Sequence, residues 1–269
     1  MKTFFALIIL FAPLCQLSVA VEKVAAKKET QKIRRSFTLA VLPDTQFYCD
    51  TRLKLSSKWG NGDLRRYFFD QTQWVKDNHK RLNIAFLVHE GDIVQADAPE
   101  EWAIAKEAMS ILDGHVPYCL CLGNHDMGFQ KSNNKFGGDI AENRTTHFNK
   151  YFPREKFAKT KEFGGTFDPK RHDNSWYHFD AAGMKFLIVS LECKPRNEVL
   201  DWANKVVGEH SEHRVIVLTH AYMGTNGKRF LRLGYKIKGN AGEAIWQKLV
   251  SKHKNIFMVL CGHASGEAV

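Results

Sequence analysis

Residues 116–126 read VPYCLCLGNHD, an apolar run followed at once by Gly, Asn, His and Asp. Residues 83–92, NIAFLVHEGD, have the same design. A near-continuous apolar run of this length indicates a β-strand that is covered on both faces. The polar residues then lie where each strand ends. Strands of this kind are typical of layered α/β proteins, so these two stretches decide the fold class.

Similar runs recur along the chain, and helical patterns separate most of them. The strand predictions are Phe37–Leu42, Asn83–Val88, Val116–Leu122, Trp176–Asp180, Lys185–Leu191, Arg214–Thr219 and Ile256–Leu260. Helices are predicted at about 62–80, 99–112, 196–208 and 242–253. The residues Ala181-Ala182-Gly183 are typical of a hairpin turn between two strands. The prediction is therefore an α/β fold with layered sheets and some antiparallel pairing.

The first 35 residues differ from the rest. Lys2, an apolar run and the small residues Ser18-Val19-Ala20 are typical of a secretory signal peptide at 1–20. An uncleaved anchor is the open alternative. Residues 21–35 carry six Lys and Arg against two Glu, which indicates a basic tether. We therefore expect a folded domain at 36–269, an extracytoplasmic location (periplasmic or secreted), and no stable membrane insertion after cleavage.

Composition excludes several classes of protein. With 269 residues, 44% hydrophobic and 25% charged, the chain is neither disordered, collagen-like nor a polytopic membrane protein. The formal net charge is +10, but half of it lies in the leader and tether. No pattern of a nucleic-acid-binding module is present, so no specific nucleic-acid partner is predicted. Five cysteines remain after the leader, an odd number, and we expect mainly free thiols.

Polar residues that can bind metals follow five of the predicted strands. In chain order they are Asp44-Thr45-Gln46, His89-Glu90-Gly91-Asp92, Gly123-Asn124-His125-Asp126, Thr219-His220 and Cys261-Gly262-His263. In open α/β sheets, ligands bind beyond the carboxyl ends of the strands. The strands would therefore bring these carboxylates, imidazoles and amides together at one edge.

Each of these residues also has a simpler interpretation. Asp92 after Gly91 suits a turn or a helix cap, and His220 suits a satisfied core histidine. Taken together, the ordered set favours function, because a specified tetrapeptide at a given position arises by chance on the order of once in 10⁵.

The motif order resembles that of the calcineurin-like metallophosphoesterases, from about Phe37 to Gly266. The resemblance implies a β-sandwich of mixed sheets flanked by α-helices, with two divalent metal ions at one edge. It also implies hydrolysis of phosphomonoesters or phosphodiesters. Two cations that share a carboxylate lower the pKa of a bridging water, and the resulting hydroxide attacks phosphorus.

The resemblance also implies roles for single residues. Asp44 matches a ligand of the first metal, and Asp92 matches the carboxylate that bridges both. Asn124, His220 and His263 match ligands of the second metal. His125 matches the catalytic histidine, which would protonate the leaving alkoxide. Asp126 would orient His125, or it could simply cap the next segment.

Two departures from the family pattern fall on the first metal. Gln46 and Ser265 stand where the pattern has histidines. Oxygen ligands alone, including the Gln46 amide, favour Mn²⁺, Mg²⁺ or Ca²⁺ over Zn²⁺ at that site. The second site, with two histidines, suits Zn²⁺, Mn²⁺ or Fe. Only six residues follow His263, so we expect a sandwich that is shortened at its C-terminus or closed differently.

Two segments suggest how a phosphate-ester substrate is held. Lys228, Arg229 and Arg232 belong to a stretch without acidic residues and would attract phosphate, unless they form a solvated loop. Residues 127–175 lack a clear period but contain many phenylalanines, so they form either a lid or a packed insertion. The function predicted is a metal-dependent phosphoesterase; the alternative is a non-catalytic metal- or phosphoester-binding protein.

Overall fold

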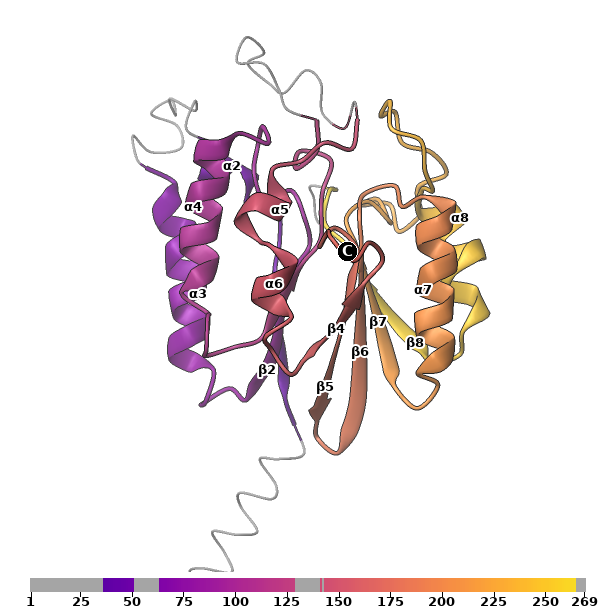
Figure 1. Cartoon of the computed structure of the whole chain (residues 1–269), viewed down its shortest axis with the longest axis horizontal. Helices are drawn as coiled ribbons and strands as arrows, with labels where there is room; N and C mark the ends of the chain where they lie inside the picture. Colours follow the sequence, from indigo (N-terminus) through magenta and orange to yellow (C-terminus); the bar gives the residue numbers. More distant parts are fainter. Residues whose placement is uncertain (1–35, 51–62, 129–140, 142, 265–269) are drawn as a thin grey trace, which may run out of the picture. The chain divides into compact units, whose positions relative to one another are not determined.

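Two β-sheets lie face to face in the part of the chain that a computed structural model describes, residues 36–50, 63–128, 141 and 143–264 (Figure 1). The first sheet has the order β1-β2-β3 and is parallel. The second has the order β4-β5-β6-β7-β8, antiparallel up to β6 and parallel from β6 onward. The strands are β1 Thr38–Leu42, β2 Ile84–His89, β3 Tyr118–Leu120, β4 Phe163–Thr166, β5 Ser175–Ala181, β6 Met184–Leu191, β7 Arg214–Thr219 and β8 Ile256–Leu260.

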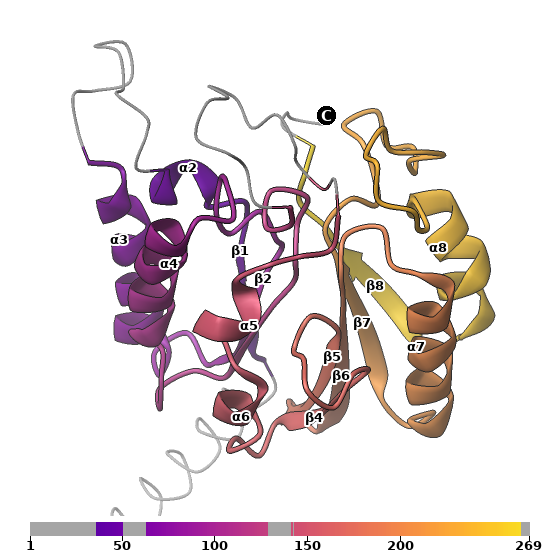
Figure 2. The ribbon, with the colours of Figure 1, turned by 45° about the horizontal axis from the view of Figure 1, so that its top comes forward.

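Helices cover the outer face of each sheet (Figures 1 and 2). Against the first sheet lie α3, Arg65–Asn78, and α4, Pro99–Ser110. Against the second lie α7, Asn197–Glu209, and α8, Gly242–Lys248, which a 3₁₀ turn at Val250–Lys252 follows. Three short helices are α2 Gln46–Cys49, α5 Phe148–Tyr151 and α6 Arg154–Phe157. None of the helices in the described ranges is long and apolar enough to cross a membrane.

The central residues of strand β6, 186–189, are apolar on both faces of the sheet. Phe186 and Ile188 belong to the core between the two sheets, whereas Leu187 and Val189 belong to the core beneath α7 and α8. Successive side chains of a strand point to opposite faces. A strand between two cores therefore has no polar face.

Aromatic rings fill the space between the sheets. The ring of Phe86 in β2 stacks on Phe179 in β5, with centroids 5.3 Å apart. Phe179 in turn stacks on Phe186 at 5.1 Å. Burying such rings stabilises each by about 1.5–3 kcal/mol. These contacts hold the two sheets together and so set the position of the edge where their strands end.

The predicted α/β sandwich of mixed sheets with flanking helices is confirmed. All seven predicted strands are present, although β3 is shorter than expected. The predicted hairpin joins β5 to β6, and Ala182 and Gly183 at its tip have φ of 51° and 76°. The prediction that the last helix runs to 253 is wrong at its end, because α8 stops at Lys248 and the 3₁₀ turn follows. Strand β4 and the short helices α2, α5 and α6 were not predicted.

The described part of segment 127–175 packs against the core, as its phenylalanines suggest. Phe148 and Phe152 are fully buried, and both rings contact Trp102 of α4. Phe129 and Phe136 lie outside the described residues, and a lid stays a prediction. The five cysteines found within the described ranges are free thiols, as expected, and four of them are buried.

Candidate metal centre

Loops that follow β1, β2, β3, β7 and β8 meet at the carboxyl ends of these strands, which we call the metal edge (Figure 2). They bring together residues more than 200 positions apart. The backbone N–H of His263, for example, donates to the carboxylate of Asp44 at 3.1 Å. Parallel strands end at one edge, and this is why motifs scattered along the sequence become neighbours.

His220 lies at the centre of the metal edge and is fully buried. Its Nε2 is 3.1 Å from Oδ2 of Asp92 and 3.1 Å from Oδ1 of Asn124. One ligand atom each from Asp92, His220 and His263 lie within 4.8 Å of one another. Two ligands of one ion, each about 2.1 Å from it and at a right angle, lie about 3 Å apart. The spacing therefore suits a divalent cation.

The hydrogen bonds of His220 leave the correct nitrogen for a metal. Its Nδ1 is 2.8 Å from the carbonyl oxygen of Glu90, which can only accept, so Nδ1 carries the proton. Nε2 then faces two acceptors, the carboxylate of Asp92 and the amide oxygen of Asn124. Burial alone would lower the pKa of His220, but Asp92 and Asp44 raise it to about 9. The cluster thus requires a cation, either a proton on Nε2 or a metal ion, and its donor set fits a metal.

The other members of the cluster have matching electrostatics. Burial tends to raise the pKa of Asp92, but His220 outweighs this effect and the pKa is lowered. Burial and the nearby His220 lower the pKa of His263 to about 4. Near neutral pH, Asp92 is therefore a carboxylate and His263 a neutral imidazole, the protonation states of metal ligands.

Two glycines keep room for the carboxylates. A Cβ on Gly123 would collide with the carboxylate of Asp92, and a Cβ on Gly262 would collide with that of Asp44. Both positions precede residues predicted to bind the second metal. The Gly-Asn and Gly-His pairs thus have a steric reason.

The first metal site has a different set of groups. Asp44 is partly exposed, and burial, together with Asp92, raises its pKa, although His220 acts in the opposite direction. Oε1 of Gln46 is buried without a hydrogen-bond partner among the described residues. A buried amide oxygen of this kind is chemically suited to bind a cation, and the role of Gln46 as a ligand stays a prediction. Ser265 lies outside the described residues.

Glu90 is a carboxylate to which the sequence interpretation assigned no role. Its Cβ lies 3.4 Å from the position of a Cβ on Gly262, next to Asp44. Burial and Asp44 raise the pKa of Glu90 to about 7. The motif His89-Glu90-Gly91-Asp92 placed it at the strand end, but only the fold shows that it adjoins Asp44.

His125 lies beside the cluster and is only partly buried. Its backbone N–H donates to Oδ1 of Asp92 at 2.8 Å, and its Nδ1 donates to the carbonyl oxygen of Gln95 at 2.8 Å. Nε2 is therefore the ring nitrogen left for a substrate. The backbone carbonyl of Gln95, not a carboxylate, sets the tautomer.

Asp126 contacts neither His125 nor the segment that follows it in the hydrogen bonds of the described residues. Its carboxylate accepts the backbone N–H of Val94 at 2.9 Å and of Gly123 at 2.8 Å. Burial and Asp92 raise its pKa, while these N–H groups act in the opposite direction. Asp126 thus holds the loop ends after β2 and β3 together.

The predicted substrate-binding residues differ in their surroundings. Lys228, Arg229 and Arg232 line a cavity of about 890 Å³ that also contacts Ala264, next to His263. Arg229 is engaged, because its Nε donates to Glu243 at 2.7 Å and its guanidinium lies over the ring of Trp246. Lys228 and Arg232 are exposed at the rim.

Comparison with known proteins identifies the family. The sequence model described as calcineurin-like phosphoesterase matches residues 37–264. The chain belongs to the calcineurin-like phosphoesterases. Members of this family are metal-dependent hydrolases of phosphoesters, and the family implies a site for two metals. The cluster of Asp92, His220 and His263 is one group that could hold a metal ion.

Individual relatives extend beyond this chain. The chain is 29% identical over 245 residues to a Bacillus subtilis protein described as uncharacterized protein YvnB, covering 89% of this chain but only 16% of that protein. It is similar to a purple acid phosphatase, PPD1, from yellow lupin (16% identity, TM-score 0.45, covering 85% of this chain and 38% of that one). A 5'-nucleotidase precursor from Thermus thermophilus has 16% identity and a TM-score of 0.38, covering 71% and 38% of the two chains. The chain thus spans well under half the length of each protein.

Proposed function

We propose that the chain is itself a metal-dependent phosphoesterase that hydrolyses phosphomonoesters or phosphodiesters at the metal edge. One observation carries the proposal: Nε2 of His220 lies 3.1 Å from Oδ2 of Asp92 and 3.1 Å from Oδ1 of Asn124. His125, the predicted catalytic histidine, directly follows Asn124 in the chain. Such a cluster is costly to bury unless a cation completes it.

The residues that would hold metal ions are Asp44, Asp92, Asn124, His220 and His263, with Gln46 and Glu90 beside the first site. Divalent ions at such a site activate water and neutralise charge on phosphate oxygens. Asn124 contributes a neutral oxygen, which limits the negative charge that faces an anionic substrate. Neutral His263 likewise adds no negative charge.

His125 would act on the leaving group. Since Nδ1 donates to Gln95, Nε2 is the nitrogen that can deliver a proton to the departing oxygen. Its partial exposure leaves it accessible to a substrate. Lys228 and Arg232 would attract the anionic substrate from the cavity rim, whereas Arg229 would support the loop through Glu243.

The test is hydrolysis of diphenyl phosphate and of phenyl phosphate by the full chain, followed through the phenol released, with and without added Mn²⁺. Their phenolate leaving group benefits from a proton, so the rate reports on His125. We expect turnover that requires metal and that falls by at least about 10²-fold in His125→Ala. His115→Ala is the matched control, because His115 is exposed at the opposite end of β3. A folded, metal-loaded protein without turnover of either ester would instead favour the non-catalytic binding function.

We further propose export of the chain, supported by the sequence of residues 1–20 alone, which lie outside the described residues. The mass of the N-terminus of protein recovered from the periplasm or medium tests this. A start at Val21 is expected, and an intact Met1 in a soluble cytoplasmic fraction would contradict it.

A further inference from the structure

The segment between β2 and α4 carries the carbonyl that orients His125. Within it, Asp92 and Asp97 have left-handed backbones, with φ of 47° and 51°. Few non-glycine residues adopt this conformation, although Asp tolerates it better than most. The place of the Gln95 carbonyl therefore depends on the groups that bind the backbone between these two turns.

Glu101 binds this backbone from the first turn of α4. Its side chain is fully buried, and its Oε2 accepts the backbone N–H of Gln95 at 2.9 Å and of Ala96 at 2.7 Å. Since Pro99 begins the helix, Glu101 is its third residue, where the helix dipole favours a negative charge. Hydrogen bonds from N–H groups to an ionised carboxylate are about twice as strong as neutral ones.

One peptide group connects Glu101 to His125. The peptide between Gln95 and Ala96 gives its N–H to Glu101, and its carbonyl accepts the Nδ1 proton of His125 at 2.8 Å. Hydrogen bonds in such a chain polarise one another, so a carboxylate at one end makes the carbonyl at the other a better acceptor. The arrangement is a carboxylate–histidine pair with one peptide inserted between its members.

We propose that Glu101 is a positioning residue for catalysis, which fixes the tautomer and orientation of His125 through the peptide between Gln95 and Ala96. The inference rests on the proposed function of His125. Asp126, the acid adjacent to His125 in sequence, instead accepts hydrogen bonds from the backbone N–H groups of Val94 and Gly123.

The first test exploits the leaving group. Nitrophenolate departs without a proton, whereas phenolate benefits from one, so loss of a general acid affects diphenyl phosphate more than bis(p-nitrophenyl) phosphate. Phenyl phosphate and p-nitrophenyl phosphate are the corresponding pair if the protein prefers monoesters. The quantity measured is the rate with diphenyl phosphate divided by the rate with bis(p-nitrophenyl) phosphate. We expect His125→Ala to lower this ratio by about 10²-fold, and Glu101→Gln to lower it by on the order of tenfold.

Controls separate positioning from general damage. Glu100→Gln alters the exposed neighbouring carboxylate and should leave the ratio unchanged. In the double variant with His125→Ala, Glu101→Gln should not lower the ratio further. An equal loss with both esters, or an added loss in the double variant, would overturn the proposal.

The second test does not depend on turnover. The imidazole Nδ1 proton of His125, assigned in the proton NMR spectrum by its loss in His125→Ala, should exchange with water at least about tenfold faster in Glu101→Gln. An unchanged exchange rate would overturn the positioning role. Absence of turnover in the metal-loaded wild type would overturn only the proposed function, because this signal still reports on Glu101.

Discussion

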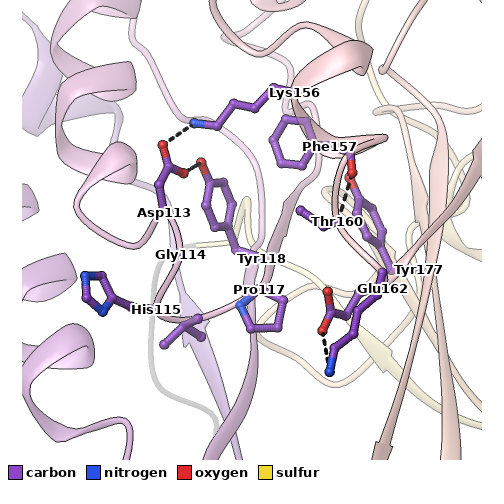
Figure 3. Close-up of a pocket in the computed structure, with 12 residues that line it drawn as sticks. Asp113, Gly114, His115, Pro117, Tyr118, Lys156, Phe157, Thr160, Glu162 and Tyr177 are labelled. Atoms are coloured by element: carbon purple, nitrogen blue, oxygen red, sulfur yellow. Dashed lines mark hydrogen bonds and ion pairs between the residues drawn. The ribbon is translucent and has the colours of Figure 1, made fainter.

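The two ends of β3 make an instructive contrast. At its start lies the pocket in Figure 3, a cavity of about 710 Å³ between the loop before β3 and the region around α6. Its charges are balanced, since Asp113 pairs with Lys156 at 2.8 Å and accepts the hydroxyl of Tyr118 at 3.0 Å. At the carboxyl end, Asp92 and Asn124 both present acceptors to His220. Because a cavity lies near each end, the carboxyl end is distinguished by its polar groups that require a cation and not by the cavity itself.

The largest effect should follow from removing the carboxylate of Asp92, which we propose as a metal ligand. Asp92→Asn takes a negative charge from the cluster, and we expect Mn²⁺ binding to weaken by more than about 100-fold, since even indirect partners of ligands cost 10- to 100-fold. Isothermal titration calorimetry measures this directly. The matched control is Asp113→Asn in the pocket of Figure 3, which should bind Mn²⁺ like wild type. Equal weakening of Mn²⁺ binding by both variants would contradict the claim that only the carboxyl end of β3 requires a cation.

The next effect concerns His172, which is buried. Its ring stacks on that of Phe157, with centroids 4.1 Å apart, and Phe157 lines the pocket in Figure 3. Burial lowers the pKa of His172 to about 3. The folded state thus keeps His172 neutral, while the unfolded chain protonates it below its usual pKa. Stability is full above about pH 6.5 and falls toward pH 3, by about 2 kcal/mol at pH 5.

Urea unfolding at pH 7 and pH 5 measures this loss. In His172→Phe, which retains the aromatic stacking, the difference between the two pH values should shrink by about 2 kcal/mol. An unchanged difference would show that His172 does not stay neutral in the folded protein.

The smallest effect should come from the exposed cations at the cavity rim. Replacing Lys228 and Arg232 with methionine should raise KM by about two- to fivefold at low salt, and by less at high salt, because exposed charges are screened. The control replaces exposed Lys159 and Lys170 with methionine, the same loss of charge elsewhere. A matching rise in KM for both pairs would indicate only a general effect of net charge.

Much of the fold follows from periodicity. Strands such as β6 have runs that are apolar on both faces, and these runs predict both their type and their place between two layers. Strand β4 could not be predicted, because Gly164 and Gly165 interrupt its pattern. Gly164 is required by the ring of Trp176, which a Cβ would strike.

The site was predictable where it depends on strand ends, and not where it depends on backbone contacts. Asp44, Asp92, Asn124, His220 and His263 all come to the metal edge as expected. The roles of Gln95 and Glu101 could not be predicted, because hydrogen bonds to a loop backbone leave no pattern in side-chain identity. The pairing of Arg229 with Glu243, 14 residues later, was likewise invisible.

The most direct test of the account is an anomalous difference map from crystals of the full chain grown with Mn²⁺. We predict a strong peak among Asp92, Asn124, His220 and His263, and a second, weaker peak on the side of Asp44. A map without a peak at His220, from crystals that hold Mn²⁺ elsewhere, would contradict the claim that this cluster is a metal site.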